Sequence, residues 1–252
     1  MGEPVAVAYA DRPVTVADPA VRAGPPPEAT IRTFRARRGR LNGGRLDALD
    51  RLWPRYGLEA PTAPGAPPVE AATLFGRRAP LVLEIGSGMG DATVAMATAD
   101  SGRDYLAVEV HLAGIANLLR QIERAGLTNV RVVRGDAIRL LRYALAPDSL
   151  DAIHVFFPDP WPKSRHHKRR LIQPANVALL RSRLVPGGTL HCATDWAEYA
   201  KVMLATLEAD PELVNAYPGF APRPAHRPVT RYEQRGLAAG RQIFDLIFHR
   251  AG

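Results

Sequence analysis

From Pro80 onward the sequence alternates short apolar runs with helix-length segments, and this alternation limits the fold more than any other feature. The apolar runs predict strands over residues 81–85, 105–108, 130–133, 151–157, 189–194 and 242–248. The intervening segments predict helices over residues 91–99, 112–122, 175–184 and 196–207. Strands separated by helices predict an α/β fold with a mostly parallel sheet and helices on both faces. Ligands of such sheets bind beyond the carboxyl ends of the strands.

The residues before this core have a different composition. Residues 1–29 are rich in Ala, Val and Pro without a sustained period, which predicts a disordered N-terminal tail and leaves residues 30–252 as a single domain. The arginine-rich residues 31–41 indicate either a solvated surface segment or a second phosphate-contacting patch. A short helix is expected over residues 42–53, followed by a proline-rich connector over residues 60–69.

Charge and cysteine content narrow the functional class. The 252 residues include 33 Lys and Arg against 25 Asp and Glu, and the net charge of +8 favours an anionic partner such as nucleic acid. Cys192 is the single cysteine, which excludes an internal disulfide and a cysteine-built metal site, and no metal is expected. The sequence shows neither a membrane-spanning apolar run nor a signal peptide, so the cytoplasm is the expected compartment.

A glycine-rich loop, reading EIGSGMGD from Glu84 to Asp91, follows the first core strand. Its glycines allow the backbone to turn tightly and to approach a ligand closely. A dinucleotide-binding fingerprint needs Gly or Ala where this chain has Asp91, which argues against NAD. The loop instead resembles the E-x-G-x-G-x-G loop of S-adenosylmethionine methyltransferases, whose cationic ligand suits neighbouring carboxylates.

Acidic residues also follow the next two strands. Glu109 ends the second strand, where a carboxylate can accept both ribose hydroxyls of a nucleoside ligand. Asp136 follows the third strand and can accept from an adenine amino group or cap the next helix, and these two roles are compatible. With Glu84, these acids predict a nucleoside-binding edge of the sheet.

The fourth strand ends in a segment interrupted by prolines, FFPDPWPK from Phe156 to Lys163. Because proline lacks an N–H and fixes φ, the strand must stop there and a stiff loop must begin. The loop presents Asp159 and Trp161 and leads into the basic residues 163–170. A carboxylate held beside a basic arm favours chemistry on a polyanion. Trp161 is either a stacking surface for a base or a core side chain that anchors the loop.

Taken together, these segments resemble the bacterial tRNA (guanine-N7)-methyltransferase family. The matching segments are residues 31–34 (IRTF), 83–86 (LEIG), 109–111 (EVH), 156–161 (FFPDPW), 168–170 (KRR), 193–196 (ATDW) and 227–236 (RPVTRYEQRG). The resemblance covers about residue 31 to the C-terminus, with small departures at Ser87, Pro162 and His167. It implies a Rossmann-like class I methyltransferase fold with a seven-stranded sheet. It also implies methyl transfer from S-adenosylmethionine to N7 of a guanosine in tRNA, at position 46 in the variable loop.

The resemblance further implies partners and a role for each matching residue. The S-adenosylmethionine site would comprise Glu84, Gly86, Gly88, Glu109, Asp136 and Asp159. The substrate guanosine region would be contacted by Lys163, Asp195, Thr230, Arg231, Tyr232 and Glu233. The RNA would be contacted by Arg165, His166, His167, Lys168, Arg169 and Arg170. The expected partner is tRNA, no obligate protein partner is evident, and the chain is expected to be a monomer or a homodimer.

Two local expectations accompany these roles. Residues 230–233 are expected in an irregular, proline-flanked loop, where a core role is not expected. Asp195 follows the fifth strand on the same edge as Asp159 and can also serve as a helix N-cap.

The implied reaction needs no base, because guanine N7 already carries an in-plane lone pair. Alignment of N7, the methyl carbon and the sulfur supplies much of the acceleration. Methylation leaves a positive charge on guanine, which either Asp159 or Asp195 stabilises; Asp159 is the expected catalytic residue. The alternatives are a non-catalytic RNA-binding protein on a methyltransferase fold and a methyltransferase acting on another RNA.

Overall fold

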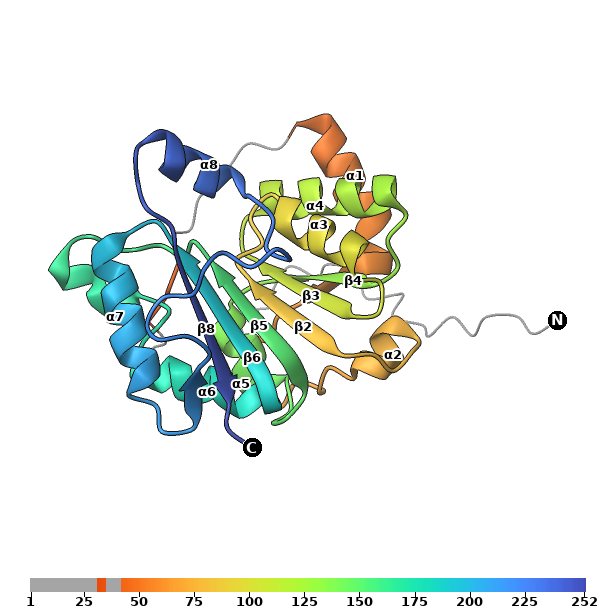
Figure 1. The fold of residues 1–252 in the computed structure, drawn as a ribbon. Helices are drawn as coiled ribbons and strands as arrows, with labels where there is room; N and C mark the ends of the chain where they lie inside the picture. Colours follow the sequence, from red (N-terminus) through yellow and green to blue (C-terminus); the bar gives the residue numbers. More distant parts are fainter. Residues whose placement is uncertain (1–30, 35–41) are drawn as a thin grey trace, which may run out of the picture. The chain divides into compact units, whose positions relative to one another are not determined.

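The computed structural model describes residues 31–34 and 42–252, and residues 31–252 form one compact unit. The predicted tail, residues 1–29, and most of the arginine-rich segment lie outside the described residues. Figure 1 shows the core of this unit as a twisted sheet with helices on both of its faces.

Eight strands form one sheet across the described residues, in the order β1-β4-β3-β2-β5-β6-β8-β7. The strands are β1 (Gly57–Glu59), β2 (Leu81–Ile85), β3 (Asp104–Glu109), β4 (Val130–Arg134), β5 (Leu150–Phe156), β6 (Leu184–Thr194), β7 (Leu213–Asn215) and β8 (Phe244–Arg250). β8 is antiparallel to both of its neighbours, and the other neighbouring pairs are parallel. From β2 the chain proceeds through β3 and β4 on one side and returns as β5 on the other. The topological switch point therefore lies between β2 and β5.

The sheet confirms the predicted α/β fold, although it has eight strands rather than seven. The additional edge strand β1 pairs with β4, with Gly57 opposite Val132. β1 begins with glycine and has only three residues, which is too short for an alternation of apolar and polar residues. Only its pairing with β4 therefore reveals this strand. β7, at the opposite edge of the sheet, is equally short, and the sequence pattern does not locate it either.

Helices cover both faces of the sheet (Figure 1). One face carries α1 (Gly43–Tyr56), α3 (Asp91–Ala99) and α4 (Leu112–Ala125), and the other carries α5 (Ala137–Tyr143), α6 (Pro174–Arg183) and α7 (Ala197–Glu208). The connections contain α2 (Ala71–Phe75), the 3-10 helix η1 (Ser164–Arg169) and α8 (Arg231–Ala238). The α1 helix begins after Asn42, whose side chain accepts the Arg45 N–H at 3.1 Å. The α4 helix ends at Ala125, and the following Gly126 has a φ of 63°, which is typical of a helix C-cap.

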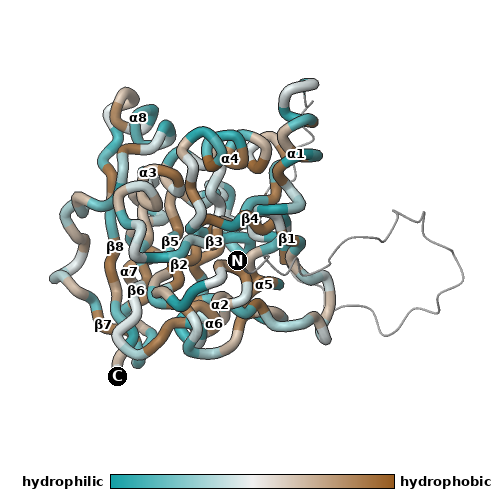
Figure 2. The backbone as a smooth tube through the Cα atoms, turned by 90° about the vertical axis from the view of Figure 1, so that its right-hand side faces the viewer, coloured by the Kyte–Doolittle hydropathy of each residue, from teal (hydrophilic) through white to brown (hydrophobic). Residues whose placement is uncertain are grey.

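An apolar core lies on each face of the sheet. Leu83 and Leu106 belong to the core beneath α5, α6 and α7, whereas Val82 and Val132 belong to the core beneath α1, α3 and α4. Each fully buried side chain of this size contributes about 1.5–3 kcal/mol. Figure 2 shows the central strands largely in brown, with much of α1 and α4 in teal. Among the described residues, no helix combines the length and apolarity needed to cross a membrane.

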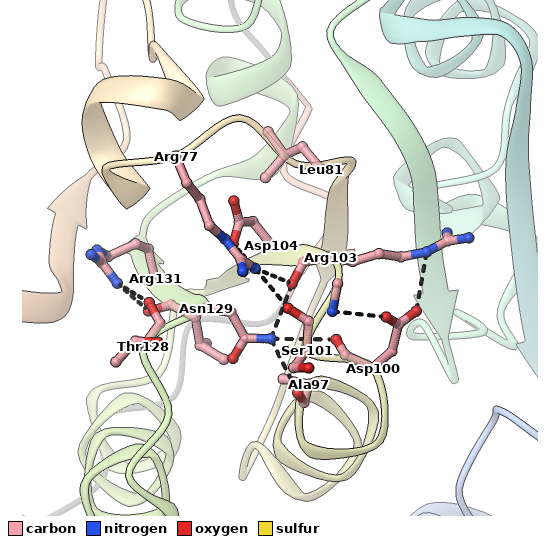
Figure 3. A network of polar contacts seen from close by, with 12 residues as sticks. Arg77, Leu81, Ala97, Asp100, Ser101, Arg103, Asp104, Thr128, Asn129 and Arg131 are labelled. Atoms are coloured by element: carbon pink, nitrogen blue, oxygen red, sulfur yellow. Dashed lines mark hydrogen bonds and ion pairs between the residues drawn. The ribbon is translucent and has the colours of Figure 1, made fainter.

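A polar network closes the amino end of β3 (Figure 3). Arg77 donates from Nε and Nη2 to Asp104 Oδ1 at 2.9 and 2.7 Å, and also from Nη2 to the Arg103 carbonyl at 3.2 Å. The side-chain amide of Asn129 donates to the carbonyls of Ala97 and Arg103 at 3.1 and 3.0 Å. These bonds pair backbone carbonyl groups in the turns around β3. They therefore hold the amino end of this strand in place.

Candidate active site

A cavity opens at the carboxyl ends of β2, β3, β4 and β5, where the topological switch predicts a ligand site. Its lining comprises Thr33, Phe34, Ile85, Gly86, Val108, Glu109, Val110, His111, Gly135, Ala137, Phe156, Phe157, Pro158, Asp159 and Leu171. The predicted cofactor residues Gly86, Glu109 and Asp159 line this cavity directly. The remaining three, Glu84, Gly88 and Asp136, adjoin it on β2 and the loops that follow β2 and β4.

The glycine loop after β2 depends on conformations that other residues rarely adopt. Gly86, Gly88 and Gly90 have φ values of 79°, 56° and 85°. A Cβ on Gly90 would lie 2.6 Å from Leu118 Cδ1 of α4. The closest approach is at Gly114, where a Cβ would lie 2.1 Å from the Gly88 carbonyl oxygen. Gly114, which sequence reasoning did not single out, therefore allows the start of α4 to pack on the loop.

Glu109 is buried at the end of β3, and its carboxylate organises the two loops around it. Oε2 accepts the Gly88 N–H at 2.8 Å. Oε1 accepts the N–H groups of Val110 and His111 at 2.6 and 2.8 Å. A carboxylate has about four lone-pair positions, so about one remains for a ligand. In this geometry Glu109 can accept one ribose hydroxyl, rather than both, without releasing a loop contact.

Glu84, in β2, is 3% exposed and lies behind the glycine loop. Burial raises the pKa of this carboxyl to about 7, against the opposing effect of a 2.5 Å hydrogen bond from the Thr93 hydroxyl. The negative charge of Glu109 raises the pKa further. A cationic ligand group nearby would favour the ionised form of Glu84.

Asp136 stands at the N-terminus of α5. Its Oδ1 accepts the Ile138 N–H at 2.9 Å, which confirms the capping role among the two expected ones. The other lone pairs of the carboxylate leave an adenine contact compatible with this cap. The preceding Gly135 packs closely on Ala60, the residue after β1, because a Cβ on Gly135 would lie 2.5 Å from Ala60 Cβ.

The proline-interrupted turn after β5 holds Asp159 on strained backbone. Phe157 and Trp161 have φ values of 52° and 44°, a conformation that costs a bulky residue about 1–3 kcal/mol. Trp161 is 3% exposed, donates from Nε1 to the Thr33 carbonyl at 3.3 Å, and has the Arg169 guanidinium 5.0 Å from its ring centroid. Of the two alternatives for Trp161, the anchoring role is therefore the one that the structure supports.

The basic segment, residues 163–170, divides into exposed and buried members. Lys163, Arg165, Lys168 and Arg169 are exposed, and His166 and His167 are half-buried. Arg170 is 2% exposed and donates to both carboxylate oxygens of Glu198, at 3.0 and 2.5 Å. Its Nε also donates to the Pro160 carbonyl at 2.9 Å. Arg170 was expected to contact RNA, but in the structure this side chain is buried and fastens the loop to α7.

The segment that begins at Thr230 starts a helix instead of forming the expected irregular loop. Thr230 caps α8, and its Oγ1 accepts a backbone N–H of the first turn at 3.1 Å. The exposed Arg231 pairs with Asp91 at 3.0 Å. A Cβ on Gly88 would lie 3.8 Å from Cε2 of the exposed Tyr232. The start of α8 therefore lies against the glycine loop.

Glu233 has the core role that the sequence did not lead us to expect. It is 2% exposed and accepts at 2.5 Å from Nη1 of Arg227, which is itself fully buried. Arg227 also donates from Nε and Nη2 to the two carboxylate oxygens of Asp245 in β8, at 2.7 and 2.8 Å. The guanidinium lies 6.0 and 5.8 Å from the ring centroids of Phe156 and Phe157. Glu233 thus positions α8 rather than facing the cavity, and Arg227 is a site-building residue that sequence reasoning missed.

Asp195 follows β6 and pairs with Arg241 at 2.7 Å. The capping role considered for it is not observed, since Thr194 Oγ1 accepts the Trp196 N–H at 3.2 Å at the start of α7. Asp195 stands on the same edge of the sheet as Asp159, because β5 and β6 are parallel neighbours. It is not among the residues that line the cavity.

A mostly parallel sheet with a glycine loop after β2, acids after β3 and β4, and a cavity over the strand ends defines a class I S-adenosylmethionine-dependent methyltransferase. Residues 78–246 match the family Methyltransf_4, described as putative methyltransferase. The fold is also similar to the crystal structure of the 16S rRNA methyltransferase KamB. The TM-score is 0.54 at 15% identity, covering 71% of this chain and 92% of that one.

Sequence comparison identifies the particular family. The chain is 53% identical over 225 residues to the tRNA (guanine-N(7)-)-methyltransferase of Streptomyces coelicolor, covering 88% of this chain and 82% of that protein. It is 50% identical over 238 residues to that of Burkholderia vietnamiensis, covering 94% and 92%. The chain therefore belongs to the tRNA (guanine-N7)-methyltransferase family, and its cofactor is S-adenosylmethionine. The remaining acceptor position on Glu109 and the nearby carboxylates fit that cationic nucleoside.

Proposed function

We propose that the protein transfers a methyl group from S-adenosylmethionine to N7 of a guanosine in tRNA. The observation that carries this proposal is that Gly86, Glu109 and Asp159 line one and the same cavity, with the exposed basic segment following Asp159 in the chain. The printed names of relatives at 50–53% identity support guanine N7 in tRNA as the target. Position 46 of the variable loop and action in the cytoplasm belong to the same proposal.

The cofactor would lie across the strand ends. Glu109 would accept one ribose hydroxyl through its remaining lone pair, and Asp136 would accept from the adenine amino group while capping α5. Gly86, without a side chain, allows close approach of the backbone to the methionine part of the ligand. Glu84 lies behind this loop, where an ammonium group would draw its raised pKa back down.

When bound, the cofactor supplies an electrophilic methyl group, and the protein's own task is to position and stabilise. Guanine N7 presents its lone pair without deprotonation, so alignment is the main requirement. Asp159 would stabilise the positive charge that develops on guanine, from a turn whose backbone is strained and stiffened by proline. A carboxylate held in this way does not need to reorganise during the reaction.

The RNA would be held by groups around this cavity. Arg165, Lys168 and Arg169 are exposed cations of η1, and we assign them to phosphate contacts. The exposed Lys163 just before them would contact the target guanosine region. Arg231 and Tyr232, at the start of α8 over the glycine loop, would contact the target guanosine. Because the major groove of A-form RNA is too narrow for side chains to reach N7, the target base must be splayed from its stack.

Nucleoside analysis tests the proposal directly. Purified protein is incubated with unmodified tRNA transcript and methyl-labelled S-adenosylmethionine, and the digested RNA should contain labelled 7-methylguanosine. A transcript with the variable-loop guanosine replaced by adenosine should accept no label, and an rRNA fragment serves as the alternative substrate. Label only in rRNA, or in another nucleoside, would overturn the assignment. Tight tRNA binding without transfer would support the non-catalytic alternative.

A further inference from the structure

Three histidines that are far apart in the sequence meet on one face of the sheet. His154 lies in β5, its register partner His191 lies in β6, and His226 lies in the segment before α8. One ring nitrogen from each lies within 4.8 Å of the others. The ring centroids are 5.9 Å apart for His154 and His191, 5.6 Å for His191 and His226, and 6.3 Å for His154 and His226.

Two of these imidazoles have a buried nitrogen without a hydrogen-bond partner. His154 is 7% exposed and His191 is 1% exposed, yet neither Nδ1 has a partner. Buried polar atoms are normally satisfied, and an unsatisfied one costs about 1–3 kcal/mol. Two such atoms beside a third imidazole form a set of nitrogen donors that can bind a cation.

The hydrogen bond of His191 points the same way. Its Nε2 lies 2.8 Å from Asp245 Oδ1. With Nε2 directed at this carboxylate, the buried Nδ1 is the ring nitrogen left to meet a ligand. A histidine oriented by a carboxylate, with its other nitrogen free, is the usual arrangement of a metal ligand.

Charged side chains around the cluster act in opposite directions. The positive charges of Arg103 and Arg227 oppose a cation here, whereas the negative charge of Asp245 favours one.

We propose that His154, His191 and His226 bind a divalent transition metal ion, with Zn²⁺ as the best fit. Three imidazole ligands with an open fourth position form a known type of zinc site. A tetrahedral zinc ion with bonds of about 2.0–2.1 Å sets its ligand atoms about 3.3 Å apart, so ligand atoms that lie up to 4.8 Å apart must approach by as much as about 1.5 Å. His226 is exposed and can supply this movement.

Such an ion would fasten the segment before α8 to the sheet. His226 immediately precedes Arg227, which holds α8 through Glu233, and Phe156 stacks on His154 while lining the cofactor cavity. Metal binding by these histidines does not depend on the identity of the RNA substrate.

The test is a metal titration of untagged, chelator-treated protein. Co²⁺ reports four-coordinate binding by its visible absorption bands, and Zn²⁺ affinity is measured by competition with a chromophoric chelator. We expect one ion per chain, and His226→Ala should weaken Zn²⁺ binding by at least about 100-fold, since even loss of an outer-shell partner costs 10–100-fold. His226→Cys, which restores a ligand, should recover the affinity.

The matched control is His249→Ala, which removes an exposed histidine of β8 outside the cluster and should bind as wild type does. Hydrogen exchange of residues 222–230 should slow on addition of Zn²⁺ in wild type and not in His226→Ala. A wild-type affinity no higher than that of His226→Ala, or a signal equally reduced in His249→Ala, would overturn the proposal. Because His226 is exposed, its replacement should leave the fold intact, and circular dichroism checks this.

Discussion

The carboxylate of Glu109 offers the sharpest test of the cofactor site, because replacing one oxygen by an amide nitrogen changes its bonding without changing its size. Oε1 already accepts two N–H groups, so the amide oxygen of Glu109→Gln must take that position. The NH₂ group then faces the Gly88 N–H, which Oε2 accepts in the wild type. Two donors oppose each other, and the lone pair proposed for the ribose is lost.

The expected loss follows from the strength of these bonds. A hydrogen bond to a charged acceptor is worth about 1.5–3 kcal/mol, so loss of the ribose contact alone should weaken cofactor binding about 10- to 150-fold. Isothermal titration with S-adenosylhomocysteine measures this change. Glu123→Gln, which alters an exposed acid of α4 paired with Arg51, is the control and should bind normally. A folded Glu109→Gln variant with affinity within about twofold of wild type would refute this account of the site.

Three further predictions concern pH, RNA and catalysis. The folded-state pKa of Glu84, about 7, lies above its ordinary value of 4.5. Between these pH values the native state therefore binds more protons than the unfolded state. The free energy of unfolding should fall by about 3 kcal/mol as pH rises through that range. Thermal melts across this range should show the fall in wild type and not in Glu84→Gln. Changing the exposed cations of η1 to Ala should reduce the log–log salt slope of tRNA binding by about 0.7–0.9 per lost contact, whereas Arg170→Ala should chiefly lower the unfolding temperature. An unchanged slope would leave these cations as a solvated face. Asp159→Asn should slow single-turnover methylation by about 10²-fold while both ligands still bind, and a normal rate would remove Asp159 from the charge-stabilising role.

Short-range sequence patterns predicted most of the core, because neighbouring residues are enough to indicate a strand, a helix or a glycine turn. The strand over residues 81–85 and the helix over residues 91–99 have the expected bounds, and the glycines between them fix the loop that the sequence indicates. The acidic residues at the carboxyl edge of the sheet were predicted from their positions at strand ends alone, since parallel strands bring their carboxyl ends together. The short edge strands β1 and β7 could not be located, because three residues carry no period of their own.

The residues that the sequence misassigned have partners distant in the chain. Arg170 belongs to a basic run, and nothing near it shows that Glu198 draws it into the interior. Glu233 follows a proline-rich stretch that is typical of a loop, yet its burial depends on Arg227 and, through it, on β8. The three clustered histidines share no spacing motif and meet only through strand register and a returning segment.

Arg227 forms a buried network of charges between α8 and β8. Replacing such a network by apolar residues is often neutral or stabilising, so burial of one guanidinium between two carboxylates is weak evidence for stability. It does fix orientation, because the guanidinium must meet Glu233 of α8 and Asp245 of β8 at the same time. The same group lies near the rings of Phe156 and Phe157, immediately before the turn that carries Asp159. The start of α8 and the Asp159 turn are therefore positioned by one side chain, which is what an in-line transfer between two separately bound molecules requires.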